Sequence, residues 1–292
     1  MILESVRKNK VKTFFIVTLF VVFIMVLIYF LSLWLFEDSY IAVAIALIFS
    51  CISALISYFN CDKIVLSLNG ARVATKQEFL QLNETLEGLC IAANLPLPKL
   101  YVIDSSALNA FATGRNPENS VICVTKGLIE KLDKYEMEGV LAHELSHIKN
   151  YDILLSTVAI IMVGLVSILA DLFMRGFYRG SDDDDNGNII LMLIGLIFIV
   201  LSPIFANLLN LTISRNREYL ADATAVSLTR NNEGLIRALQ KINNDNNVLN
   251  TANKTSASLY ICNPFKDKRN KDSLFSTHPT IENRIYRLRN IK

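Results

Sequence analysis

The stretch of sequence that decides the fold reads Lys134-Tyr-Glu-Met-Glu-Gly-Val-Leu-Ala-His143-Glu144-Leu-Ser-His147-Ile-Lys-Asn150. Apolar residues recur in it at helical spacing and no proline interrupts it, which predicts a helix. In a helix, His143 and His147 lie one turn apart on the same face. Two imidazoles so placed can bind one Zn²⁺ ion, and Glu144 can take a proton from a water on that ion.

A solvated helix that carries two histidines and a glutamate by chance is the alternative interpretation. The histidine count argues against it. The chain has only 3 His, and two of them occupy the metal-ligand positions of the H-E-x-x-H pattern. We therefore expect one Zn²⁺ per chain.

The composition indicates a membrane protein. Of the 292 residues, 52% are hydrophobic and only 19% are charged, and the mean hydropathy is +0.37. A net charge of +2, with no long Lys/Arg tract, predicts no nucleic-acid partner. The 5 cysteines form no metal-binding pair and no evident disulfide framework, which favours a reducing compartment.

Four apolar runs are long enough to cross a bilayer, which needs about 20 residues. They pair as two hairpins: Phe14–Phe36 with Tyr40–Phe59, and Leu154–Met174 with Ile189–Leu211. Positive charge gathers at the N-terminus, after the second run and after the fourth, so both termini are expected in the cytoplasm. The chain then divides into a membrane hairpin (1–61), a cytoplasmic segment with the histidine helix (62–153), a second hairpin (154–211) and a cytoplasmic C-terminal segment (212–292).

The cytoplasmic segments contain mixed secondary structure. Sequence patterns predict strands at Lys99–Ile103, Asn109–Thr113 and Ser120–Thr125, the last two joined as a hairpin. They predict helices at Thr75–Ala93, Ser214–Leu228 and Glu233–Ile242, and a basic helix through Arg284 and Arg287 with Pro279 in its first turn. Asn247–Asp272 is expected to be an irregular or mobile loop.

A catalytic zinc needs a third protein ligand. The metzincin continuation is excluded, because Asn150 and Ile153 occupy the positions of its glycine and third histidine. Glu218 and Asp222 lie four residues apart, so Glu218 can bind the metal while Asp222 orients a ligand histidine. Two apolar runs separate His147 from Glu218, which brings both segments to the same side of the membrane.

Four motifs follow one another along the chain: Asn109-Ala-Phe-Ala-Thr-Gly114, Val140-Leu-Ala-His143-Glu144-Leu-Ser-His147-Ile-Lys-Asn150, Ser214-Arg-Asn-Arg-Glu218-Tyr-Leu-Ala-Asp222-Ala and Thr277-His278-Pro279. These motifs and their order resemble those of the HtpX-type membrane metalloproteases, bacterial relatives of the CAAX prenyl proteases. The chain resembles that family over nearly its whole length. The resemblance implies His143, His147 and Glu218 as zinc ligands and Glu144 as general base. Tyr151, where the family more often has a charged residue, is one small departure.

The expected fold is a mainly α membrane protein: four transmembrane helices with a cytoplasmic gluzincin-like zinc-protease domain that contains a small β-sheet. By analogy with gluzincins, His278 could stabilise the oxyanion, although it could equally be an ordinary residue at a helix start. Asn109 and Phe111 belong to an apparent edge strand that could pair with an extended substrate. A turn or capping role for Asn109 is an open alternative.

The resemblance implies a zinc endopeptidase of the bacterial inner membrane that acts in protein quality control at the cytoplasmic face. Its expected partners are unfolded or membrane protein substrates, the lipid bilayer and other membrane-associated quality-control proteases. A prenyl-peptide protease is the closer alternative. A non-catalytic metal or ion carrier is a more distant one, because the apolar runs offer only Asp171 as an ionisable group.

Overall fold

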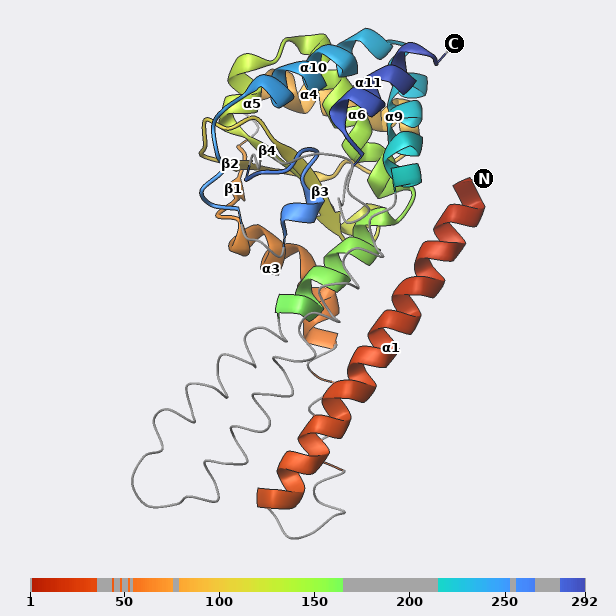
Figure 1. The fold of residues 1–292 in the computed structure, drawn as a ribbon, viewed down its shortest axis with the longest axis vertical. Coiled ribbons are helices and arrows are strands. Elements are labelled where there is room, and N and C mark those ends of the chain that lie inside the picture. The colour runs from red at the N-terminus through yellow and green to blue at the C-terminus, as the bar shows by residue number, and fades with distance from the viewer. Residues whose placement is uncertain are drawn as a thin grey trace.

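Helices dominate the computed structural model, which describes residues 2–35, 44, 48, 52, 55–75, 79–164, 215–252, 256–265 and 279–291. Figure 1 shows one long helix, α1 (Ile2–Leu35), running away from a domain that holds a small sheet and the remaining labelled helices. The second and fourth predicted membrane runs lie outside the described residues, apart from a few positions of the second. The four-segment division of the chain therefore stays a prediction.

The sheet has four strands in the order β1-β2-β4-β3: β1 (Arg72–Val73), β2 (Lys99–Ile103), β3 (Ala110–Gly114) and β4 (Ser120–Thr125). β2 and β4 are parallel, and the other neighbours are antiparallel. The predicted β3–β4 hairpin is confirmed, with Phe111 opposite Cys123. Gly114 ends β3 with φ of 136°, a value that L side chains rarely adopt, and this permits the turn. β3 is left at the edge of the sheet.

The predicted histidine helix, α6 (Lys134–Lys149), lies at the centre of the domain. It packs on β3 and on the helices α4 (Leu80–Ala93), α9 (Arg215–Thr229) and α10 (Asn232–Asn244). Five of its apolar side chains are fully buried: Val140, Leu141, Ala142, Leu145 and Ile148. A helix surrounded on all sides can carry polar catalytic groups only where they pair with one another.

Two apolar helices lead away from this core. In the described part of the chain, α1 is the one helix long and apolar enough to cross a membrane, with an apolar span at Val6–Val26. The shorter helix Asp152–Gly164 begins just after α6 and contains the start of the third predicted run. Phe20 and Ile24 of α1 belong to the same buried cluster as Leu154 and Val158. Figure 1 shows the two helices extending from the same side of the domain.

Most predicted elements lie close to their observed bounds, and the differences have local causes. α4 begins at Leu80 rather than Thr75. The last helix, α11 (Ile281–Arg289), begins after Thr280, whose side chain accepts the N–H of Asn283. Pro279 therefore precedes the cap, and its predicted place in the first turn is wrong. Three short elements were not predicted: α3 (Cys61–Leu68), β1 and α5 (Lys126–Lys131).

The stretch Asn247–Asp272, expected to be an irregular or mobile loop, is packed against the domain where the structure describes it. It contains the short 3-10 helix η2 (Ala257–Leu259). Tyr260 is fully buried, and its hydroxyl donates to the Asn69 side chain at 3.0 Å. The asparagines of this stretch suggested a loop, but its apolar residues 259–262 supply enough buried surface to fix part of it in place.

The described cysteines are free thiols. Cys61, Cys90 and Cys123 are buried. Burial raises the pKa of Cys61 and of Cys90 to about 11 and raises that of Cys123 further. These thiols therefore stay protonated and unreactive at neutral pH.

The contact between α6 and α10 depends on Gly139. A Cβ added there would lie 2.8 Å from the backbone nitrogen of Leu235, a distance that real Cβ atoms do not show. We predict that Gly139→Ala separates the two helices and destabilises the protein by about 1–3 kcal/mol. Gly88→Ala, on α4, is the matched control, because nothing lies within 4 Å of the added methyl group.

The control should gain about 0.5–1 kcal/mol from helix propensity. The measurement is the unfolding midpoint of both variants in detergent. Equal midpoints for Gly139→Ala and the parent would contradict the close approach of α6 and α10.

Candidate metal centre

The start of α6 is fixed by a capping box. The Asp133 side chain accepts the N–H of Glu136 at 3.0 Å, and the Glu136 carboxylate accepts the N–H of Asp133 at 2.8 Å. Glu136 is buried, and Lys241 of α10 compensates its charge at 2.6 Å. A well-defined start sets the rotation of the helix, which turns His143 and His147 toward α9.

The donor atoms of His143, His147 and Glu218 gather where α6 meets α9, all within 4.8 Å of one another. The two histidine Nε2 atoms are 3.2 Å apart. The Glu218 carboxylate lies 3.6 Å from Nε2 of His147 and 3.7 Å from Nε2 of His143. The sequence places Glu218 far from the histidines, and the fold brings it to them.

These distances fit a tetrahedral zinc site. Ligands at 2.0–2.2 Å from a tetrahedral ion are about 3.3–3.6 Å apart, close to the separations observed. Two neutral imidazoles and one carboxylate are a donor set that zinc peptidases use, and they leave a fourth position open. The residues present therefore fit a zinc ion, with His143, His147 and Glu218 as its ligands.

His143 is held by a buried pair of charges. Its Nδ1 lies 3.0 Å from Asp222 Oδ1, which leaves Nε2 for the metal. Arg284 of α11 donates two hydrogen bonds to the Asp222 carboxylate, at 2.7 and 2.9 Å. Burial alone would raise the pKa of Asp222, but Arg284 and His143 hold it below its usual value. Burial, reinforced by the Arg284 charge, lowers the pKa of His143, so that ring stays neutral.

His147 is oriented from the other side by Asp152. Its Nδ1 lies 3.1 Å from Asp152 Oδ2, so Nε2 again points to the metal. Burial would lower the pKa of His147, but the hydrogen bond to Asp152 and the charge of Glu218 raise it to about 9. Each ligand histidine thus has its own carboxylate partner, an arrangement that fixes the ring and raises its basicity.

Glu144 lines the same cavity between the histidines and the sheet. The cavity measures about 40 Å³ and also includes Ala112 of β3 and the chain from Ser258 to Ile261 among its walls. Burial raises the pKa of Glu144 to about 7, with Glu218 adding to the shift, while His147 opposes it. A carboxylate that titrates near neutrality is suited to accept and return a proton.

Of the residues predicted to bind substrate, Phe111 lies on β3 and Asn109 lies just before it, and both contact the chain itself. Asn109 donates from its side chain to the Cys262 carbonyl at 2.8 Å, and its side-chain oxygen accepts the N–H of Ala110 at 3.1 Å. The Ile261 N–H donates to the Ala110 carbonyl at 2.9 Å. Phe111 is fully buried and packs edge-on against Tyr260 with ring centroids 4.9 Å apart. Their substrate role stays a prediction.

Two functional residues were missed in the sequence, and one predicted residue cannot be placed. Asp152 and Arg284 were not singled out, although Arg284 lies four residues before Leu288 on the buried face of an otherwise basic helix. Asp152 offered a weaker signal, an acid five residues after His147. His278 lies outside the described residues, so its predicted role is untested.

A family model described as Peptidase family M48 matches residues 76–292. The chain belongs to this family. A protein named Protease HtpX homolog from Dictyoglomus thermophilum is 45% identical over 289 residues, covering 98% of this chain and 93% of the relative. Another of the same name from Listeria monocytogenes is 40% identical over 304 residues and covers both chains completely.

The fold also resembles a solved structure, that of S. mikatae Ste24p. The TM-score is 0.51 at 22% identity, and the match covers 98% of this chain and 67% of the other. The resemblance to HtpX-type M48 proteases drawn from the motifs is confirmed. The chain is a membrane zinc metallopeptidase with His143, His147 and Glu218 as its zinc ligands. The interpretation as a non-catalytic carrier is wrong.

The raised pKa of His147 predicts a pH-dependent zinc affinity. Zinc binds the neutral ring, so below a pKa of about 9 each binding event must displace one proton. Zinc affinity should therefore rise about tenfold per pH unit below that pKa and level off above it, at a pH somewhat under about 9 in a Glu144→Gln protein, because the Glu144 charge helps to raise the pKa of His147. Chelator-buffered zinc titrations measure this, in a Glu144→Gln background that removes the other group titrating near neutrality.

Asp152→Asn supplies the control. It removes the carboxylate that raises the pKa of His147, so the affinity should level off at a lower pH. A zinc affinity that does not change over this pH range in the Glu144→Gln protein would show that His147 is already neutral.

Proposed function

We propose that this M48 peptidase hydrolyses peptide bonds of unfolded or damaged membrane proteins at the cytoplasmic face of the bacterial inner membrane. The observation that carries the proposal is the position of the metal site on the fold. The ligand His147 lies five residues before the helix Asp152–Gly164, an apolar helix that leads away from the domain next to α1. A site so close to apolar helices is suited to chains that emerge from the bilayer.

The chemistry is assigned to Glu144 by its place in the cavity. When bound, zinc supplies Lewis acidity that polarises a scissile carbonyl and acidifies water. Glu144 takes a proton from water and returns it to the leaving amine, and its pKa of about 7 suits both steps. His143, His147 and Glu218 hold their donor atoms in place while Asp222 and Asp152 keep the two rings oriented.

Substrate is proposed to bind along β3, the edge strand beside Glu144. An extended peptide added to an exposed edge gains backbone hydrogen bonds without a sequence requirement, which suits a protease that removes many different damaged chains. The chain's own Ile261 and Cys262 already contact Ala110 and Asn109. The Ala112 end of the strand, which lines the cavity, is therefore the part open to substrate.

The enzymatic proposal is tested with Glu144→Gln. The amide keeps the size of the side chain but cannot take a proton, so hydrolysis should fall by at least about 10²-fold while bound zinc stays at one ion per chain. Metal analysis and proteolysis of a detergent-solubilised, unfolded membrane protein measure the two quantities. Full hydrolysis by the variant would remove Glu144 from the mechanism.

A farnesylated peptide in the same assay separates the two substrate classes. Cleavage of the unfolded membrane protein by the parent enzyme, with the prenyl peptide left intact, is the expected result. Cleavage of the prenyl peptide alone would replace the proposal with the prenyl-peptide alternative.

The proposed topology has four membrane spans and both termini in the cytoplasm. The positive charge at the N-terminus and after the second and fourth runs supports it. We predict that reporters fused after Val65 and at Lys292 read as cytoplasmic, whereas a reporter near Gly180 reads as external. Opposite readings at Val65 and Lys292 would mean an odd number of spans between them. The four-span arrangement would then be rejected.

A further inference from the structure

The junction between α6 and the helix Asp152–Gly164 is contacted by the first helix of the chain. The junction turns sharply, because Tyr151 adopts a left-handed φ of 57°, a conformation that non-glycine residues seldom adopt. Asn9 of α1 donates to the Asn150 carbonyl at 3.0 Å and to Asp152 Oδ1 at 2.7 Å. Lys10 places its ammonium 4.2 Å from the centre of the Tyr151 ring. Asn9 and Lys10 of α1 thus contact the three junction residues, 150–152.

The Asn9 side chain is buried in this contact and fully hydrogen-bonded. It is 4% exposed, and the two acceptors of its side chain use both of its amide protons. Asn150 is the C-cap of α6, where helix carbonyls lack partners within the helix, and Asn9 supplies one. A buried amide inside an apolar span is costly unless it is bonded in this way.

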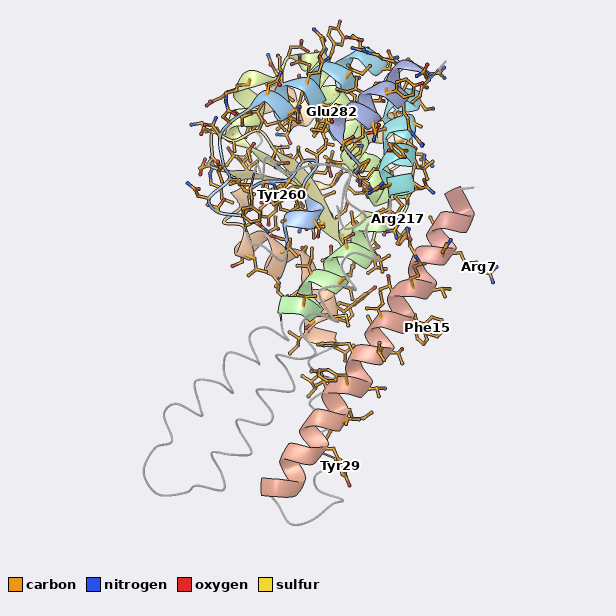
Figure 2. All side chains as sticks on the ribbon, viewed as in Figure 1. Arg7, Phe15, Tyr29, Arg217, Tyr260 and Glu282 are labelled. Atoms are coloured by element: carbon orange, nitrogen blue, oxygen red, sulfur yellow. The ribbon has the colours of Figure 1, made fainter. Side chains whose placement is uncertain are left out.

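The docked face of α1 is narrow. Its buried side chains form one stripe, with Asn9 and Thr13 followed by Phe20 and Ile24, about two and three turns after Thr13. Phe14 and Phe15, outside this stripe, are exposed, whereas Ile16 and Phe23 beside it are partly buried. Figure 2 shows Arg217 on the side of the domain that faces α1 and Arg7 pointing away from it. The polar end of the stripe therefore lies against the metal centre, and the apolar end lies against the helix Asp152–Gly164.

We propose that Asn9 is a positioning residue for the zinc site, so that the first membrane helix forms part of the active centre. Asn9 fixes one carboxylate oxygen of Asp152, and the other oxygen, 3.1 Å from Nδ1, orients the ring of His147. Arg217 lies 3.6 Å from the same Oδ1 and supplies compensating charge. Loss of Asn9 therefore leaves Oδ1 of Asp152 with the longer Arg217 contact in place of a 2.7 Å hydrogen bond, and the orientation of His147 is held less firmly.

Asn9→Leu tests the proposal, because it keeps a side chain of similar size and removes both donors. Partners of metal-binding histidines are typically worth 10–100-fold in metal affinity. We expect zinc affinity, measured by chelator competition, to fall about tenfold or more. The visible spectrum of the Co²⁺-substituted enzyme should change, and kcat per bound zinc should fall with KM unchanged.

Thr13→Val is the matched control. Thr13 lies on the same buried stripe, and its hydroxyl bonds only the Asn9 backbone carbonyl, at 2.9 Å. A role limited to docking α1 would make the two variants alike, with less folded protein but normal zinc affinity, spectrum and kcat per zinc. That result for Asn9→Leu would overturn the proposal.

A double-mutant cycle tests whether Asn9 affects zinc binding through Asp152. If Asn9 acts through Asp152, then Asn9→Leu should cost little further zinc affinity in an Asp152→Asn background. Independent, additive losses would overturn the proposed path. Should Asn9→Leu fail to fold, Asn9→Ser keeps a small polar group at the buried position, and parental zinc affinity in that variant would overturn the proposal equally.

Discussion

The ion pair between Arg284 and Asp222 is the interaction on which the rest of the site depends. Both side chains are almost completely buried, and removing either would leave the other charge without its main partner inside the domain. The pair joins α11 to α9 and, through Asp222, to His143 on α6. Arg284 also donates to the Ile261 carbonyl at 3.1 Å, and this bond fixes the segment 258–261 that lines the cavity. One guanidinium thus links four segments that are distant in the sequence.

Much of the fold could be predicted from local patterns. The bounds of β2 and β4 match their predictions because alternating or β-branched residues end at clear turn signals. Helix α6 could be predicted because its apolar periodicity and its H-E-x-x-H pattern both indicate a helix. Glu218 was found because a zinc site with two histidines requires a third ligand, and few acids lie on a helix that the topology returns to the same side.

What the sequence did not reveal depends on contacts between distant residues. Arg284 lies in a basic helix that looks solvated, and only its ion pair with Asp222, 62 residues away, makes its burial tolerable. Asp152 and Asn9 are separated by 143 residues, and neither forms part of a recognisable motif. No sequence pattern within α1 indicates that its buried amide, Asn9, positions the metal ligand His147 on α6.

The place of Arg284 in the last helix also sets the order in which the enzyme can become active during synthesis. The ribosome builds the chain from the N-terminus, so α1 and α6 exist long before α11. Until α11 is made and docks, the carboxylate of Asp222 lacks its counter-charge and His143 lacks a fixed partner. A nascent or truncated chain that lacks α11 therefore holds an unfinished metal site.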